Sequence, residues 1–191
     1  MKRNAHKIVI VIGLLIALSA CGKAQPPKII IVRHAEKLAD WPGGATGVYQ
    51  PLSETGIATA NRLADAFEPG SLTAIYSSAT TRTLHTAFPV SQKLGIPLEV
   101  AEACADTNAI NAFYEMLQDK YEPEDTILLV SHSNIVPYLL IRAGLPKDCY
   151  DSMDFTESQD WLLTDYYGEL FVIDKQPSNG SECAAYQRSP F

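Results

Sequence analysis

The sequence is short of basic residues and of cysteines. Its 191 residues contain 15 Lys and Arg against 22 Asp and Glu, which gives a formal net charge of −7, and only four cysteines. A chain with this acidic balance is a poor candidate for binding nucleic acid or anionic lipid by charge. It also has no internal repeat and no low-complexity run. These absences exclude a repeat array, and the length fits one globular domain.

Motifs for metals and nucleotides are missing as well. The histidines and cysteines show no spacing typical of a zinc site, and no glycine-rich loop for a nucleotide phosphate is present. We therefore expect no metal site and no cofactor. Apart from Cys21 near the N-terminus, the cysteines are Cys104, Cys149 and Cys183. These three allow at most one disulfide, in an oxidising compartment, and the sequence leaves the pairing open.

The one long hydrophobic run lies at the N-terminus. Three basic residues precede apolar residues 8–17, a run shorter than the ~20 residues of a membrane span but suited to the core of a signal peptide. Residues 18–21, Leu-Ser-Ala-Cys, resemble the lipobox of bacterial lipoproteins, in which the cysteine is lipidated and becomes the mature N-terminus. An ordinary secretory signal cut nearby, or an uncleaved anchor, is the alternative.

This pattern predicts how the chain is organised and where it resides. We expect a lipoprotein signal peptide at 1–20, the lipidated Cys21 with a spacer at 21–27, one domain at 28–174 and a loosely held tail at 175–191. Cleavage before Cys21 would remove three basic residues and no acidic one, so the net charge would fall to −10. Lipid on Cys21 would then hold the protein at the periplasmic face of a bacterial membrane or at the cell surface.

Strands and helices alternate along the chain. Apolar runs predict strands at 29–32, 72–76, 97–101, 126–130 and 169–173, and apolar residues at helical spacing predict helices near 53–67, 80–94, 108–120 and 133–144. Ile57 and Phe88 are among the residues expected to pack inward. The alternation predicts an α/β fold: a single three-layer α/β/α domain with a mainly parallel sheet.

Three of these strands run directly into polar residues that suit a phosphate. Arg33 and His34 follow the first, Arg82 comes shortly after the second, and His132 follows the strand at 126–130. Ligands of open α/β sheets bind outside the carboxyl ends of parallel strands, so these side chains are expected to meet. Arginine presents a fork of donors to phosphate oxygens, and a neutral imidazole can attack phosphorus. The pattern therefore predicts phosphoryl transfer through a histidine.

The same stretches resemble, in order and spacing, the motifs of the histidine phosphatase superfamily, also called phosphoglycerate-mutase-like. Residues 33–37, Arg-His-Ala-Glu-Lys, are similar to the family signature, and residues 51–56, Pro-Leu-Ser-Glu-Thr-Gly, to its "PLT-x-x-G" turn. Residues 77–87 are similar to its "SS-x-x-x-R-x-x-x-TA" segment, and residues 130–134 to its "V-G-H-S" motif. The resemblance covers about residues 28–145.

The resemblance implies the histidine-phosphatase fold and a role for each matching residue. It makes His34 the nucleophile that becomes phosphohistidine, with Arg33, Arg82 and His132 binding the phosphate. Family members commonly place an acidic residue after the strand that follows the second arginine's helix, to protonate the leaving oxygen. Asp106 falls at that place, with Glu102 as second choice, although Asp106 also suits the cap of a helix near 108.

We therefore expect a metal-independent histidine acid phosphatase-type hydrolase, tethered through Cys21. It would cleave a phosphomonoester or a phosphoramidate, in a phosphorylated small molecule, a sugar phosphate or a phosphoprotein. A lipoprotein that binds phosphorylated ligands without turnover and a phosphomutase are the alternatives. Segments 38–52 and 145–168 are expected to flank the site, and their aromatic residues could line it or cover the core: Trp41, Tyr49, Tyr150, Phe155, Trp161, Tyr166 and Tyr167.

Overall fold

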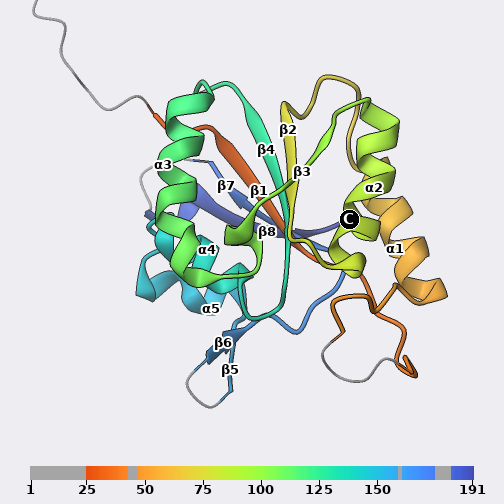
Figure 1. Cartoon of the computed structure of the whole chain (residues 1–191). Helices are drawn as coiled ribbons and strands as arrows, with labels where there is room; N and C mark the ends of the chain where they lie inside the picture. Colours follow the sequence, from red (N-terminus) through yellow and green to blue (C-terminus); the bar gives the residue numbers. More distant parts are fainter. Residues whose placement is uncertain (1–24, 43–46, 159–160, 175–181) are drawn as a thin grey trace, which may run out of the picture.

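The centre of the computed structural model is a six-stranded, mainly parallel sheet (Figure 1). The structure describes residues 25–42, 47–158, 161–174 and 182–191, so the expected signal peptide and Cys21 lie outside the described residues. The strand order is β3-β2-β4-β1-β7-β8. The parallel strands are β1 (Lys28–Arg33), β2 (Ala74–Ser77), β3 (Leu98–Val100) and β4 (Thr126–Ser131), and the antiparallel ones are β7 (Glu169–Ile173) and β8 (Tyr186–Pro190).

Helices cover both faces of this sheet. In Figure 1, α1 and α2 lie on one side of the strands and α3 and α4 on the other. The helices are α1 (Glu54–Asp65), α2 (Thr81–Leu94), α3 (Ile110–Lys120), α4 (Val136–Arg142) and α5 (Tyr150–Met153). Short 3-10 turns η1 (Glu102–Cys104), η2 (Thr107–Ala109), η3 (Lys147–Cys149) and η4 (Glu182–Ala185) and a hairpin of β5 (Thr156–Ser158) and β6 (Trp161–Leu163) complete the chain. The predicted fold class is confirmed.

Each central strand contributes side chains to two cores because successive residues of a strand point to opposite faces. In β1, Ile29 and Ile31 belong to the core under α3 and α4, whereas Ile30 and Val32 belong to the core under α1 and α2. All four are buried. This two-sided burial explains why the central strands read as unbroken apolar runs rather than as alternating patterns.

Two residues expected in the core lie at the surface instead. Ile57 of α1 is 54% exposed and Phe88 of α2 is 52% exposed. The buried positions of both helices are mostly small residues, such as Thr59 and Ala60 in α1 and Thr86 and Ala87 in α2. Small residues let α1 and α2 approach each other closely, and the larger apolar side chains one position away then face outward.

The C-terminal region is more ordered than predicted. Residues 186–190 form β8, which pairs with all of β7, so the expectation of a loosely held tail is wrong for these residues. Cys183 is bonded to Cys149, which settles the pairing that the sequence left open, and Cys104 is buried with a free thiol. The pattern missed β8 because an edge strand buries few side chains, here Tyr186.

Candidate functional site

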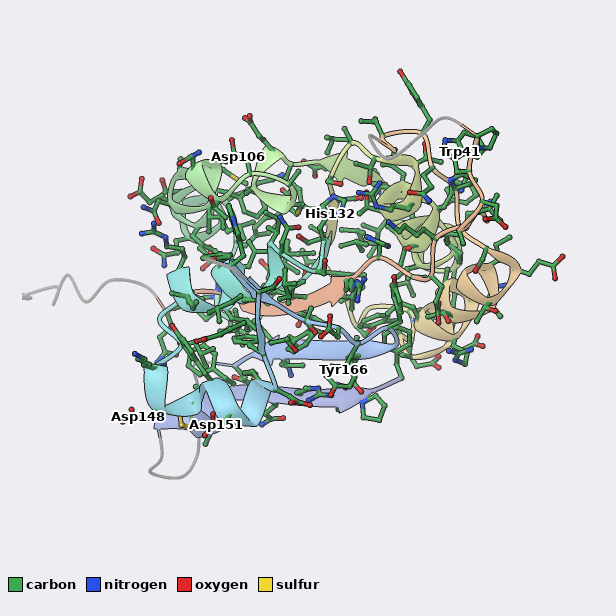
Figure 2. The ribbon with its side chains drawn as sticks, turned by 90° about the horizontal axis from the view of Figure 1, so that it is seen from below. Trp41, Asp106, His132, Asp148, Asp151 and Tyr166 are labelled. Atoms are coloured by element: carbon green, nitrogen blue, oxygen red, sulfur yellow. A yellow bond between two sulfur atoms is a disulfide. The ribbon has the colours of Figure 1, made fainter. Side chains whose placement is uncertain are left out.

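The carboxyl ends of β1, β4 and β2 bring four basic side chains together. Arg33 ends β1 and His34 follows it, His132 directly follows β4, and Arg82 lies in the first turn of α2, after β2. These strands are neighbours in the sheet, and the rings of His34 and His132 are 5.4 Å apart, edge to face. Figure 2, seen from below, shows His132 between Asp106 and Trp41. We call Arg33, His34, Arg82 and His132 the basic cluster.

His34 is fixed in one tautomer by its own backbone neighbour. Its Nδ1 lies 2.8 Å from the carbonyl oxygen of Ala35. A carbonyl oxygen can only accept, so Nδ1 carries the proton and Nε2 keeps its lone pair. Burial, followed by the charges of Arg82 and His132, lowers the pKa of His34 to about 3. The ring is therefore neutral at physiological pH, with a nitrogen available to attack.

His132 is held neutral by a different set of contacts. Nη2 of Arg82 donates to its Nδ1 at 3.2 Å, and its Nε2 lies 2.8 Å from Oγ of Ser78. Because Nδ1 accepts, Nε2 carries the proton and donates it to Ser78, whose hydroxyl also lies 2.7 Å from that of Thr83. Burial and then the nearby arginines lower the pKa of His132 to about 4.

Among the described contacts, the hydrogen bonds of the two arginines go to neutral groups: two backbone carbonyls, a phenol and an imidazole. Nη1 of Arg82 donates to the Gly47 carbonyl at 2.7 Å. The Nε atoms of both Arg33 and Arg82 are buried and have no partner among the described residues. Within the same part of the chain, neither guanidinium forms an ion pair with a carboxylate. The basic cluster thus presents donors that no group of the described chain satisfies.

A segment distant in sequence also contacts Arg33. Nη1 of Arg33 donates to the Thr164 carbonyl at 3.1 Å, and Nη2 of Arg33 donates to the hydroxyl of Tyr167 at 2.9 Å. Ser78 and Thr164 were not among the predicted site residues, whereas Tyr167 was one of the seven aromatic residues that could line the site or cover the core. Ser78 lies within the motif segment 77–87 and could have been found from it. Thr164 lies in the segment expected to flank the site, but no motif marks it or the contact of Tyr167 with Arg33.

The motif at 51–56 supports the residues that follow His34. Ser53 caps α1 by accepting from the Gly56 amide, and its own amide donates to the Glu36 carbonyl at 2.9 Å. A Cβ on Gly56 would lie 2.0 Å from that same carbonyl oxygen, so only glycine fits. The Ala35 amide donates to Thr86 of α2 at 2.9 Å. These contacts fix the chain immediately after His34.

The two candidate general acids lie in η1 and beside η2. The carboxylate of Asp106 accepts from the backbone amide of Asn108 at 2.9 Å and from its side chain at 3.0 Å. It therefore caps η2, as the alternative interpretation held, and its role as the acid stays a prediction. Glu102 is exposed and lines a separate surface hollow with Glu99 and Lys120. Neither carboxylate has a described hydrogen bond to the basic cluster.

The flanking aromatic residues divide between the surface, the core and the site. Tyr49 is 78% exposed, and Trp161 and Tyr166 are also exposed, so these three side chains are not buried in the core. Tyr150 and Phe155 pack against the core as expected. Of the seven, Tyr167 is the one hydrogen-bonded to the basic cluster.

Among the described residues, no group of three or more His, Cys, Asp or Glu side chains is arranged to hold a metal ion. Within the same ranges, no helix has the length and hydropathy needed to cross a membrane.

Comparison with known families addresses the resemblance directly. The family model of the histidine phosphatase superfamily (branch 1) matches residues 29–109. This match confirms the resemblance to the histidine phosphatase superfamily. It covers His34, Arg33, Arg82 and Asp106, and ends before His132. No curated protein matches the chain in sequence.

Several solved structures share this fold over most of the length of the chain. The protein histidine phosphatase SixA, solved with tungstate, is 19% identical with a TM-score of 0.55, covering 85% of this chain and 94% of its own. The alpha-ribazole phosphatase of Shigella flexneri is 17% identical with a TM-score of 0.59, and the match covers 86% of this chain and 95% of that protein. Phosphoglycerate mutase of Plasmodium falciparum is 21% identical with a TM-score of 0.52, and the match covers 86% of this chain and 89% of that protein.

The lowered pKa of His34 predicts how stability depends on pH. The unfolded chain protonates this residue below pH 6.5, whereas the folded chain does so only near pH 3, so the folded state loses stability as pH falls from 6.5. Between pH 7 and pH 5 this one group should cost about 2 kcal/mol. Urea unfolding should therefore show His34→Gln losing about 2 kcal/mol less than wild type over this interval.

The matched control is His85→Gln, because His85 is an exposed histidine on α2. It should lose as much stability as wild type between the two pH values. An equal loss in wild type and His34→Gln would show that His34 is not held neutral by the fold.

Proposed function

We propose that this protein is a phosphatase that hydrolyses a phosphomonoester or a phosphoramidate through a phosphohistidine on His34. The observation that carries this proposal is the basic cluster, in which two guanidinium groups lie beside two neutral imidazoles. Among the residues that the structure describes, neither guanidinium forms an ion pair with a carboxylate, and each has a buried Nε without a partner. Buried polar groups without partners are rare in folded proteins, so they point to an external ligand. A phosphate dianion supplies both the charge and the acceptors that this cluster lacks.

The first chemical step uses the lone pair of His34. Nε2 attacks phosphorus, an N–P bond forms, and the bond to the leaving atom breaks with its electron pair. Arg33 and Arg82 stabilise the charge on the phosphoryl oxygens, where catalysis of phosphoryl transfer chiefly acts. The dianion also favours a proton on His132, whose Nδ1 then donates to an oxygen. A protonated Nδ1 can no longer accept from Arg82, so Nη2 of Arg82 is released toward the phosphate.

The second step returns His34 to its starting state. The Asp106 carboxylate, which has given up its proton in the first step, takes a proton from water as the water attacks the phosphohistidine. The N–P bond then breaks with its electron pair returning to Nε2, and inorganic phosphate leaves. In the first step an ester leaving group needs a proton, which Asp106 would supply after releasing Asn108. A phosphohistidine substrate has a better leaving group and depends less on that acid.

Two structural neighbours are named as phosphatases, which supports hydrolysis. The first is a protein histidine phosphatase solved with tungstate, a tetrahedral oxyanion like phosphate, and the second is an alpha-ribazole phosphatase. A third neighbour is a phosphoglycerate mutase, so mutase chemistry stays the alternative. The substrate class extends to phosphorylated small molecules, sugar phosphates and phosphoproteins.

The proposed location is the outer side of a bacterial membrane, anchored through lipid on Cys21. The sequence before Cys21 supports export, and the bond between Cys149 and Cys183 supports an oxidising compartment, because disulfides are rare in reducing ones. The segment expected to precede the domain, residues 21–27, would serve as the spacer.

The first test is hydrolysis of p-nitrophenyl phosphate by the purified protein in excess chelator. Wild type should turn over, and His34→Ala should lose roughly 10³-fold or more in kcat/KM, because it removes the nucleophile. Asp106→Asn should slow an alkyl phosphate far more than p-nitrophenyl phosphate, whose leaving group needs no acid.

His85→Ala serves as the control for this assay and should keep wild-type rates, since His85 is exposed and lies outside the basic cluster. If wild type binds phosphate but hydrolyses neither p-nitrophenyl phosphate nor a phosphoramidate, the protein is a binding lipoprotein instead. Turnover that survives His34→Ala would contradict the phosphohistidine route.

The anchor is tested by Cys21→Ser in bacterial cells that process lipoproteins. Wild type should incorporate a labelled fatty acid and the variant should not, because the proposed acylation site is lost. Cys104→Ser is the control and should be labelled like wild type, since this buried thiol takes no part in anchoring. A wild-type protein without label, or a Cys21→Ser protein that is still labelled, would contradict the lipid anchor.

A further inference from the structure

Tyr167 contacts Arg33 through both its ring and its hydroxyl. The guanidinium carbon lies 3.9 Å from the centre of the ring, and Nη2 donates to the phenol oxygen at 2.9 Å. Arginine stacks favourably on aromatic faces, more so where water is excluded. Together with the bond from Nη1 to the Thr164 carbonyl, these contacts hold the guanidinium from two sides.

Tyr167 is itself anchored by its neighbour in the chain. The Tyr166 hydroxyl donates to the Asp154 carboxylate at 2.5 Å, and Nη1 of Arg188 donates to the same oxygen at 3.0 Å. The Arg188 guanidinium lies 4.0 Å over the Tyr166 ring. This cluster ties the segment that carries Tyr167 to β8, and Figure 2 shows Tyr166 beside the sheet strands. The segment that contacts Arg33 is therefore held in place by side-chain contacts with β8.

We propose that Tyr167 is a positioning residue that holds Arg33 ready for the phosphate, an inference that rests on the proposed function. An arginine side chain has many rotamers, and ordering it on binding costs affinity. Tyr167 and Thr164 engage the two terminal nitrogens beforehand and leave the buried Nε–H unpaired for a phosphoryl oxygen. Without the tyrosine, Arg33 is free to turn toward Glu36 or Asp165, the carboxylates whose charge already acts on it.

The test measures binding of inorganic phosphate by calorimetry to the whole protein, at a pH where wild type binds. Tyr167→Phe keeps the ring and should weaken binding about threefold, whereas Tyr167→Leu removes both contacts and should weaken it about tenfold. The same substitutions are then made in an Arg33→Met background. There Tyr167→Leu should change the affinity less than about twofold, because its effect passes through Arg33.

Tyr114→Phe is the matched control. It also removes a tyrosine hydroxyl that donates a hydrogen bond, to the Leu139 carbonyl between α3 and α4, yet it should leave phosphate affinity unchanged. Thermal unfolding of each variant checks the fold, and if Tyr167→Leu does not fold, Tyr167→Phe carries the comparison alone.

Wild-type affinity in Tyr167→Phe and Tyr167→Leu would overturn the inference, and so would an undiminished effect in the Arg33→Met background. A wild-type protein that binds no phosphate also overturns it, whereas hydrolysis by that preparation would leave the proposed function standing. Phosphate binding with the predicted coupling but no turnover would instead keep the role of Tyr167 and refute the phosphatase.

Discussion

Burial of two histidines beside two arginines is the constraint on which the chemistry of this molecule depends. Exclusion of water lowers the pKa of both His34 and His132, so the two rings stay neutral next to two permanent positive charges. A neutral His34 is a nucleophile, and a neutral His132 can accept a hydrogen bond from Arg82. Within the described ranges no carboxylate forms an ion pair with either arginine, and the proposed substrate brings a negative charge into contact with them.

The rest of the fold serves to hold these groups in place. Three parallel strands, β1, β4 and β2, bring the basic cluster to the carboxyl-end edge of the sheet, and the Ser53–Gly56 turn fixes the backbone after His34. The antiparallel strand β7 pairs with β1, which places Tyr167, two residues before β7, against Arg33 at the end of β1. The Cys149–Cys183 bond links η3 to η4, which precedes β8. The C-terminal part therefore contributes to the site as well as to stability.

The sequence could predict what local patterns encode. Apolar runs located the central strands, and their polar ends located the basic cluster, because the carboxyl ends of parallel strands share one edge. The sequence placed Tyr167 and Thr164 in a segment expected to flank the site, but it could not predict their contacts with Arg33, since they lie more than 130 positions from it and no periodicity surrounds them. The buried faces of α1 and α2 were misread because they are built from small residues.

The most direct test of the account is to trap the enzyme intermediate. Wild-type protein would be mixed with p-nitrophenyl phosphate, quenched in alkali, which preserves phosphohistidine, and digested for mass spectrometry. The account predicts one added phosphoryl group on the peptide containing His34, lost on acid treatment and absent from His34→Ala. A phosphoryl group on Ser78 or His132 instead, or turnover with no phosphorylated peptide at all, would contradict it.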